Sequence, residues 1–270
     1  SQTTDGPVQV EALRVNLPDG ELTLDNPNNQ IDTIAAKLDT ASRDFSLRNA
    51  GAMTVGTVDS LDGIALNDAG NLRISLEDGA LTLEQAITTG TTGDLDLRSG
   101  GSIVFDPAGT TEFTSLVTDD GTVQLITDGA ITTTKTTDDD FYSISPTGEV
   151  RIEAGSGIGT NANRIELRDV TTLAAAGGTG GIWIEQTGMD DVSDVLTIGS
   201  VAAINPDWPT GGTVTPDPLL GLTTTGDNAP ITLVTAGTDA DLTISQAVDA
   251  HGSGDVDLRA EGSRDITLDN

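Results

Sequence analysis

The most constraining feature of this sequence is a short apolar–polar–apolar triplet, usually opened by Gly or Asp, that recurs along the chain. Alternation with a period of two is typical of a half-buried strand, and turn residues bound each triplet. The triplets are Leu22–Leu24, Ile64–Leu66, Leu81–Leu83, Leu95–Leu97, Val123–Leu125, Val150–Ile152, Ile182–Ile184, Leu242–Ile244 and Val256–Leu258. The pattern predicts an all-β chain in which the outer two residues of each triplet point inward.

The spacing of the triplets indicates how the strands are arranged. Leu81 and Leu95 are 14 residues apart, Leu95 and Ile103 are 8 apart, and two short strands therefore recur about every 22–24 residues. Intervals of this size are typical of solenoids. We expect residues 1–270 to form one elongated, right-handed parallel β-helix of about 22–24 residues per coil, with roughly a dozen coils.

Internal self-similarity and composition favour the same fold. Leu81–Ala86 resembles Leu242–Ala247, and Gly93–Arg98 resembles Gly254–Arg259, both at an offset of 161 residues. We interpret these pairs as repeated coils. Aromatic residues make up only 3% of the chain, which suits the narrow interior of a β-helix. Residues 30–45 are the one ambiguous stretch, because their apolar residues approach helical spacing.

Charge and composition exclude several classes of protein. The chain has 43 acidic and 12 basic residues, a formal net charge of -31 and no Cys. Such a charge repels phosphate backbones, which argues against a nucleic-acid partner. The absence of Cys excludes disulfides and Cys-based metal sites. No run approaches the ~20 apolar residues of a membrane-spanning helix.

Catalytic motifs have little support in the sequence. The single histidine, His251, lies within five residues of Ser253 and Asp255, whereas a Ser-His-Asp triad normally combines separate elements. Gly155–Gly159 lacks the Lys and the strand–helix context of a phosphate loop. We interpret both stretches as turns and expect no enzyme activity and no cofactor. The enzyme alternative, a polysaccharide lyase or glycosidase, would need two carboxylates in one groove.

Dense carboxylates raise the question of calcium, which selects oxygen ligands. The candidate ligands are Asp94, Asp96, Asp138, Asp139, Asp140, Asp255 and Asp257. The loop that begins at Asp138 has the length of an EF-hand loop, but Ser143 stands where that motif requires Gly. The alternative is a solvated acidic surface, in which Asp96 and Asp257 face water and Asp96→Asn is nearly neutral.

Four aromatic residues are candidates for stacking on sugars: Phe141, Tyr142, Trp183 and Trp208. Trp183 lies between two inward isoleucines and is expected to point outward. Trp208 lies in the Pro-rich stretch 205–218, which we predict to be a loop that projects from the rod. The alternative is that this loop folds back and packs Trp208 on the rod.

Several segments resemble filamentous-haemagglutinin-like bacterial exoproteins. The resemblance rests on Asn26–Ile31 followed by Ile34–Ala36, on Phe45–Gly51, and on the Gly-x-Leu-x-Leu triplets. It is clearest over Leu22–Phe105 and Asp241–Leu268, and its degenerate motifs specify architecture better than a ligand. In that family the 30–45 segment is usually a strand, so the resemblance favours a strand there. Asn26-Pro27-Asn28 matches the family's secretion domain only as a tripeptide.

The resemblance implies a structural and adhesive function. We expect an interior segment of a long adhesin, secreted to the bacterial cell surface or biofilm matrix through an outer-membrane transporter. Zero Cys fits a protein exported unfolded. Its expected partners are an exopolysaccharide or a cell-surface glycan, and self-association is also expected. Besides the enzyme, a further alternative is a self-assembling surface filament or layer protein.

Overall fold

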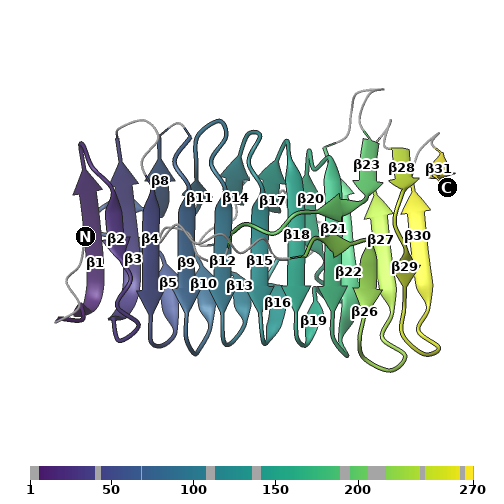
Figure 1. Ribbon diagram of the computed structural model, residues 1–270, viewed down its shortest axis with the longest axis horizontal. Coiled ribbons are helices and arrows are strands. Elements are labelled where there is room, and N and C mark those ends of the chain that lie inside the picture. The colour runs from purple at the N-terminus through teal and green to yellow at the C-terminus, as the bar shows by residue number, and fades with distance from the viewer. Residues whose placement is uncertain are drawn as a thin grey trace.

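The computed structural model describes residues 6–39, 44–67, 69–107, 113–135, 141–188, 195–205, 217–237, 241–261 and 265–269. These residues form a parallel β-solenoid of about nine turns, and none of them is helical (Figure 1). Two large sheets run the length of the rod and enclose the core between them. Within the described ranges, no helix is long and apolar enough to span a membrane.

The first large sheet, sheet A, has 15 strands and contains most of the shorter elements. Its strands are β1 (Gln9–Leu17), β3 (Gln30–Leu38), β5 (Met53–Val55), β8 (Ile64–Leu66), β10 (Leu81–Leu83), β11 (Ile87–Thr88), β13 (Ile103–Phe105), β14 (Phe113–Thr118), β16 (Ala130–Thr133), β17 (Phe141–Pro146), β19 (Gly157–Ile158), β20 (Ile165–Arg168), β22 (Gly181–Thr187), β27 (Ile231–Thr235) and β30 (Val256–Ala260).

The second large sheet, sheet B, has 12 strands, and two short antiparallel pairs lie outside both large sheets. The strands of sheet B are β2 (Leu22–Leu24), β4 (Phe45–Asn49), β9 (Leu72–Leu76), β12 (Leu95–Ser99), β15 (Val123–Thr127), β18 (Glu149–Ala154), β21 (Thr172–Gly177), β23 (Val195–Ile198), β26 (Leu222–Thr224), β28 (Asp241–Ile244), β29 (Val248–Asp249) and β31 (Ile266–Leu268). The two pairs are β6 (Thr57–Val58) with β7 (Leu61–Asp62), and β24 (Ser200–Val201) with β25 (Leu219–Leu220).

The core consists of aliphatic side chains stacked in register from coil to coil. Leu97 lies between Ile74 and Leu125 in neighbouring strands, and all three side chains are fully buried. The prediction that the outer residues of each triplet point inward is therefore confirmed at Leu83, Leu97 and Val123. Leu258, in the last coil, is partly buried and packs against the same core.

Some coils match the predicted 22–24 residues and others are longer, and about nine turns form instead of a dozen. Equivalent positions on β9 and β12 are 23 residues apart, and those on β12 and β15 are 28 apart. The extra residues lie in the corners between strands. The triplets show where the strands lie but carry little information about the length of the corners. The sequence-based prediction of the number of residues per coil was therefore too low for the longer coils.

The two sheets exchange roles at β21 and β22. From β4 up to this point, each coil places one unbroken strand in sheet B, such as β12, and two shorter strands in sheet A, such as β10 and β11. β22 then pairs with both β19 and β20, and sheet A continues unbroken through β27 and β30. Gly177, Gly178, Gly180 and Gly181 accompany this exchange, and a Cβ on Gly178 would lie 1.9 Å from a backbone oxygen.

The exchange changes the meaning of the internal repeat. β10 lies in sheet A, whereas the similar β28 lies in sheet B. Conversely, β12 lies in sheet B and the similar β30 in sheet A. The segments related by 161 residues thus share a strand–corner–strand unit but lie on opposite sheets.

The ambiguous segment is a strand, β3, as the family resemblance indicated. Its alternation shifts phase between Ile31 and Ile34, which are both fully buried although they are three residues apart. The new phase is kept from Ile34, which pairs with β5, to Ala36, which pairs with β8. Ala35, between them, is also fully buried. The β6–β7 hairpin contacts β3, which accounts for the burial of an outward residue. The phase shift produced the apparent helical spacing.

The register yields a stability prediction. Leu97→Asn should lower the free energy of unfolding by about 3 kcal/mol or more, because it removes a buried aliphatic group and buries an amide in an apolar ladder. Thr82→Asn, on the outer face of β10, should cost less than about 1 kcal/mol. Chemical denaturation of both variants measures the difference, and equal losses would contradict the register.

Candidate functional site

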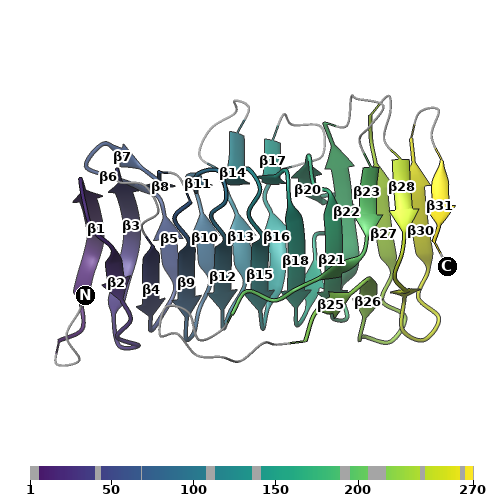
Figure 2. The same cartoon turned by 45° about the horizontal axis from the view of Figure 1, so that its top comes forward.

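An insertion between β23 and β26 runs back over the outer face of sheet B. Its described parts are residues 200–205 and 217–220, which we call the strap, and β24 and β25 pair antiparallel at its base. Figure 2 shows the strap leaving the C-terminal third of the rod and crossing the middle coils. At Asn205 and Asp217, near the two ends of the predicted loop 205–218, the chain bonds to sheet B, and residues 206–216 lie outside the described residues. Trp208 lies outside the described residues.

Beneath the strap, sheet B carries an outward row of polar side chains. Register aligns Arg73 on β9 with Asp96 on β12, Gln124 on β15 and Arg151 on β18. We call these four residues the polar ladder. Strand alternation directs them away from the core, yet each is at most 7% exposed. Sheet B is thus covered on both faces over these coils.

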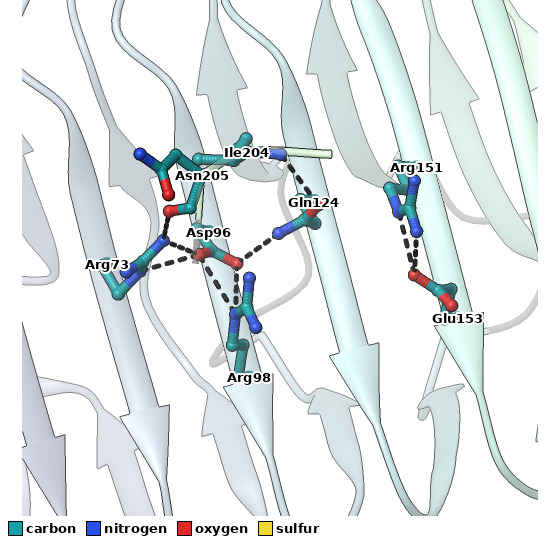
Figure 3. Close-up of polar contacts among 8 residues, drawn as sticks. All are labelled: Arg73, Asp96, Arg98, Gln124, Arg151, Glu153, Ile204 and Asn205. Atoms are coloured by element: carbon teal, nitrogen blue, oxygen red, sulfur yellow. Dashed lines mark hydrogen bonds and ion pairs between the residues drawn. The ribbon is translucent and has the colours of Figure 1, made fainter. Parts of the chain in front are cut away.

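The polar ladder holds the strap through the strap's backbone (Figure 3). Arg73 donates to the carbonyl oxygen of Asn205, and the amide of Ile204 donates to Gln124 Oε1 at 3.1 Å. Arg151 Nη1 donates to the carbonyl oxygens of Val201 and Asp217, at 3.3 and 3.2 Å. Buried backbone groups require hydrogen-bond partners. The polar ladder supplies such partners to the backbone of the strap, whose β24 and β25 also pair with each other.

Asp96 is the electrostatic centre of the polar ladder. Its Oδ2 lies 2.6 Å from Arg73 Nη2 and 2.7 Å from Arg73 Nε. Its Oδ1 accepts from Arg98 Nε at 3.0 Å and from Gln124 Nε2 at 2.8 Å. With 1% of its side chain exposed, Asp96 is a buried carboxylate whose charge two guanidinium groups compensate. The expectation that it faces water is wrong, because the strap covers an otherwise outward position.

A pocket of about 300 Å³ lies between the edge of the polar ladder and the strap. It is lined by Asn71, Leu72, Asp94, Asp96, Thr122, Ala202, Ala203, Ile204 and Asn205. Sequence reasoning missed this pocket. The only signal was the pair of acids in the Gly93–Arg98 segment, and its other wall comes from residues that are distant in the chain.

Asp94 belongs to a side-chain ladder along the corner before sheet B. Asp44 Oδ1 accepts from the amide of Asn71, and Asn71 Oδ1 accepts from the amide of Asp94, both at 3.0 Å. Asp94 Oδ1 accepts from the amide of Thr122 at 2.9 Å. Burial raises the pKa of Asp94, the Thr122 bond opposes that rise, and the neighbouring charge of Asp96 adds to it.

The two carboxyl groups that line the pocket, those of Asp94 and Asp96, differ in their capacity to contact a ligand. Both oxygens of Asp96 are engaged by Arg73, Arg98 and Gln124, which leaves little capacity to contact a substrate or water. Asp94 is half-buried and lines the pocket, and burial raises its pKa. Glycoside hydrolysis uses two carboxyl groups that both reach the scissile bond. The arrangement suits the binding of the strap better than such chemistry.

The remaining calcium candidates are separate from this pocket. Asp257 forms an ion pair with Arg259 at 2.5 Å, and that hydrogen bond lowers the pKa of Asp257. Asp255 is exposed. Asp138, Asp139 and Asp140 lie outside the described residues. Among the residues that are described, no group of three or more His, Cys, Asp or Glu side chains could hold a metal ion.

Three of the four aromatic candidates, Phe141, Tyr142 and Trp183, lie among the described residues. Phe141 is only 2% exposed and belongs to the core, so the expectation that it could stack on a sugar is wrong. Tyr142 lies beneath Arg168, whose Cζ is 4.9 Å from the ring centroid. Trp183 points outward between the buried Ile182 and Ile184, as predicted, and its Nε1 donates to the carbonyl oxygen of Gly180 at 3.1 Å.

The His251–Asp255 stretch is a corner of the solenoid, whereas Gly155–Gly159 combines a corner with the short strand β19, so its interpretation as a turn holds only at Gly155 and Ser156. Ser253 donates its amide to Asn228 Oδ1 at 3.0 Å, and His251 Nε2 lies 3.3 Å from Asp227, so neither bonds the other. In Gly155–Gly159, the amides of Gly155, Ser156 and Gly159 donate to carbonyl oxygens of the preceding coil. Because these amides already donate to the neighbouring coil, they are not free to donate to a phosphate.

Comparison with protein-family models, with characterised proteins and with solved structures finds no match to this chain.

Asp96 and Asp257 form a matched pair for testing the polar ladder, because both occupy the fourth position of a Gly-Asp-x-Asp-Leu-Arg segment. Asp96→Asn should cost about 3 kcal/mol of unfolding free energy, since it leaves the buried Arg73 without its counter-ion. Asp257→Asn should leave the melting temperature unchanged, because its ion pair is exposed. Thermal and chemical unfolding of both variants give the comparison. A neutral Asp96→Asn would mean that the strap does not bury this charge.

Asp94→Asn should increase stability at pH 7. Asn can keep the bond to the Thr122 amide, as Asn71 bonds the Asp94 amide, and it removes a poorly solvated charge beside Asp96. A raised folded-state pKa means that the folded protein gains stability as pH falls through that pKa. The advantage of the variant should therefore shrink between pH 7 and pH 4. An advantage that grows on acidification would contradict the burial of Asp94.

Proposed function

We propose that this chain is an elongated structural segment of a secreted bacterial adhesin, which spans distance and presents its faces for adhesion. The observation that carries the proposal is the continuity of the two sheets along the rod, with 15 and 12 strands. Each coil hydrogen-bonds to the next, so tension along the axis is shared by many parallel backbone bonds. A compact catalytic domain has no need of such a repeated stack.

The strap supports the same function. It joins β9 to β18 of sheet B through hydrogen bonds to Arg73 on β9, Gln124 on β15 and Arg151 on β18. Separation of these coils would expose the buried charge of Asp96. The strap therefore reinforces the middle coils of the rod, which precede the exchange of the two sheets at β21 and β22.

We infer a cell-surface or biofilm-matrix location and export through an outer-membrane transporter. The support is the resemblance of Asn26–Ile31 and Phe45–Gly51 to filamentous-haemagglutinin-like exoproteins, together with zero Cys and the net charge of -31. A disulfide-free chain can cross a transporter unfolded. A strongly acidic rod also stays soluble at high local concentration.

The structural proposal is tested in the bacterium that produces the protein. Residues 6–269 are deleted in one strain and replaced in a second strain by an unrelated β-solenoid of similar length. Adhesion should fall in the deletion strain and recover in part with the replacement, because the replacement restores the length of the segment but not its outer faces. Loss of adhesion with both alterations would contradict a purely structural function and place a ligand site in this chain.

Cleavage of a polysaccharide at the pocket is the second candidate function, and the raised pKa of Asp94 is the observation that favours it. A raised pKa favours the protonated carboxyl group, which is the form that acts as a general acid. Incubation with neutral and acidic polysaccharides, followed by a reducing-end assay, tests this candidate. Activity that Asp94→Asn abolishes would establish it, and unchanged substrates would leave the structural function.

A further inference from the structure

The outward residues of β5, β10, β13 and β16, four neighbouring strands of sheet A, are uncharged. Register aligns the central outward residues of β5, β10, β13 and β16, which are Thr54, Thr82, Val104 and Thr132. Two residues earlier in each coil, a second outward row contains only Ala or Ser. We call these two rows the threonine face. Its side chains are half-buried or exposed.

The threonine face is flat and has unused hydrogen-bonding groups. Ala, Ser, Thr and Val side chains are short, and strands stack about 4.8 Å apart, so the hydroxyl groups follow the rod axis at regular intervals. The hydroxyls of Thr54, Thr82 and Thr132 form no hydrogen bond with any described residue. They remain able to donate to and accept from a ligand.

Acidic residues frame this uncharged surface. Glu84 and Asp106 are exposed along one border, just after β10 and β13. Asp78 and Asp128 are exposed along the other, just before β10 and β16. In a chain with a net charge of -31, this arrangement repels a polyanion and also a second copy of the same rod. An uncharged ligand meets neither repulsion.

Trp183 continues the central row toward the C-terminus. The pairing of Ile131 with Ile158 and of Ile158 with Ile182 places Gly159 between Thr132 and Trp183. Gly159 has a φ of +62°, and a Cβ there would lie 2.4 Å from the carbonyl oxygen of Trp183. The central row therefore has no side chain at Gly159, between Thr132 and Trp183. Because Gly180 already accepts from the indole N–H, the ring can serve as an apolar surface.

We propose that the threonine face and Trp183 bind an uncharged linear polysaccharide aligned with the rod axis. Threonine hydroxyls would pair with sugar hydroxyls, and threonine methyl groups and the indole would contact the C–H faces of the sugar rings. A ligand that repeats along its length can contact successive coils, so weak contacts add up. This inference rests on the proposed adhesive function and names the class of its ligand.

Co-sedimentation of the full chain with insoluble cellulose and chitin, and affinity electrophoresis in soluble galactomannan, test the inference. At least one of these neutral polysaccharides should retain the protein, whereas alginate, a polyanion, should not. Thr82→Glu should weaken retention at least tenfold, and Trp183→Ala severalfold. The matched control is Thr223→Glu, which adds the same charge to a half-buried outward threonine on β26 of sheet B and should leave retention unchanged. Circular dichroism confirms that each variant is folded.

Three results would overturn the inference: no retention by any of the three neutral polysaccharides, retention that Thr82→Glu leaves unchanged, or sedimentation velocity showing self-association that Thr82→Glu abolishes. The last result would assign this face to a second copy of the chain. The replacement strain separates this inference from the structural function. If an unrelated solenoid restores adhesion and no polysaccharide retains the protein, the polysaccharide-binding inference is rejected and the structural function stands.

Discussion

Backbone hydrogen bonding between successive coils is the interaction on which the rest of this structure depends. The described strands of both large sheets pair in parallel, and only β6–β7 and β24–β25 pair antiparallel. A single coil cannot satisfy its own strand amides, so each coil is a template for the next. This requirement enforces register, and register stacks Ile74, Leu97 and Leu125 into a continuous apolar core.

Register also aligns the outward residues, and their surroundings then decide what each row does. On sheet B the row from Arg73 to Arg151 is covered by the strap and becomes a buried charged network. On sheet A the row from Thr54 to Thr132 stays at the surface and is uncharged. A carboxylate at Asp96 is tolerated in the first row because Arg73 and Arg98 compensate it.

The exchange of roles between the sheets shows how local similarity can mislead about position. β12 and β30 share a sequence pattern, but β12 lies beneath the strap and β30 lies in the last complete coil of sheet A. Asp96 is consequently 1% exposed, whereas Asp257 is 40% exposed. Equivalent motifs therefore differ in charge environment, stability and accessibility to a ligand.

The sequence by itself determined the strands, their inward faces and the corner turns, because apolar alternation and turn residues act over a few positions. Leu97, Ile182 and the His251–Asp255 turn lie as those local rules predicted. Only the tertiary structure decided the coil length, the sheet exchange and the burial of Asp96, Phe141 and the polar ladder. The physical reason is distance along the chain: Arg73 bonds Asn205, 132 residues away, and no local pattern encodes which distant backbone will cover an outward side chain.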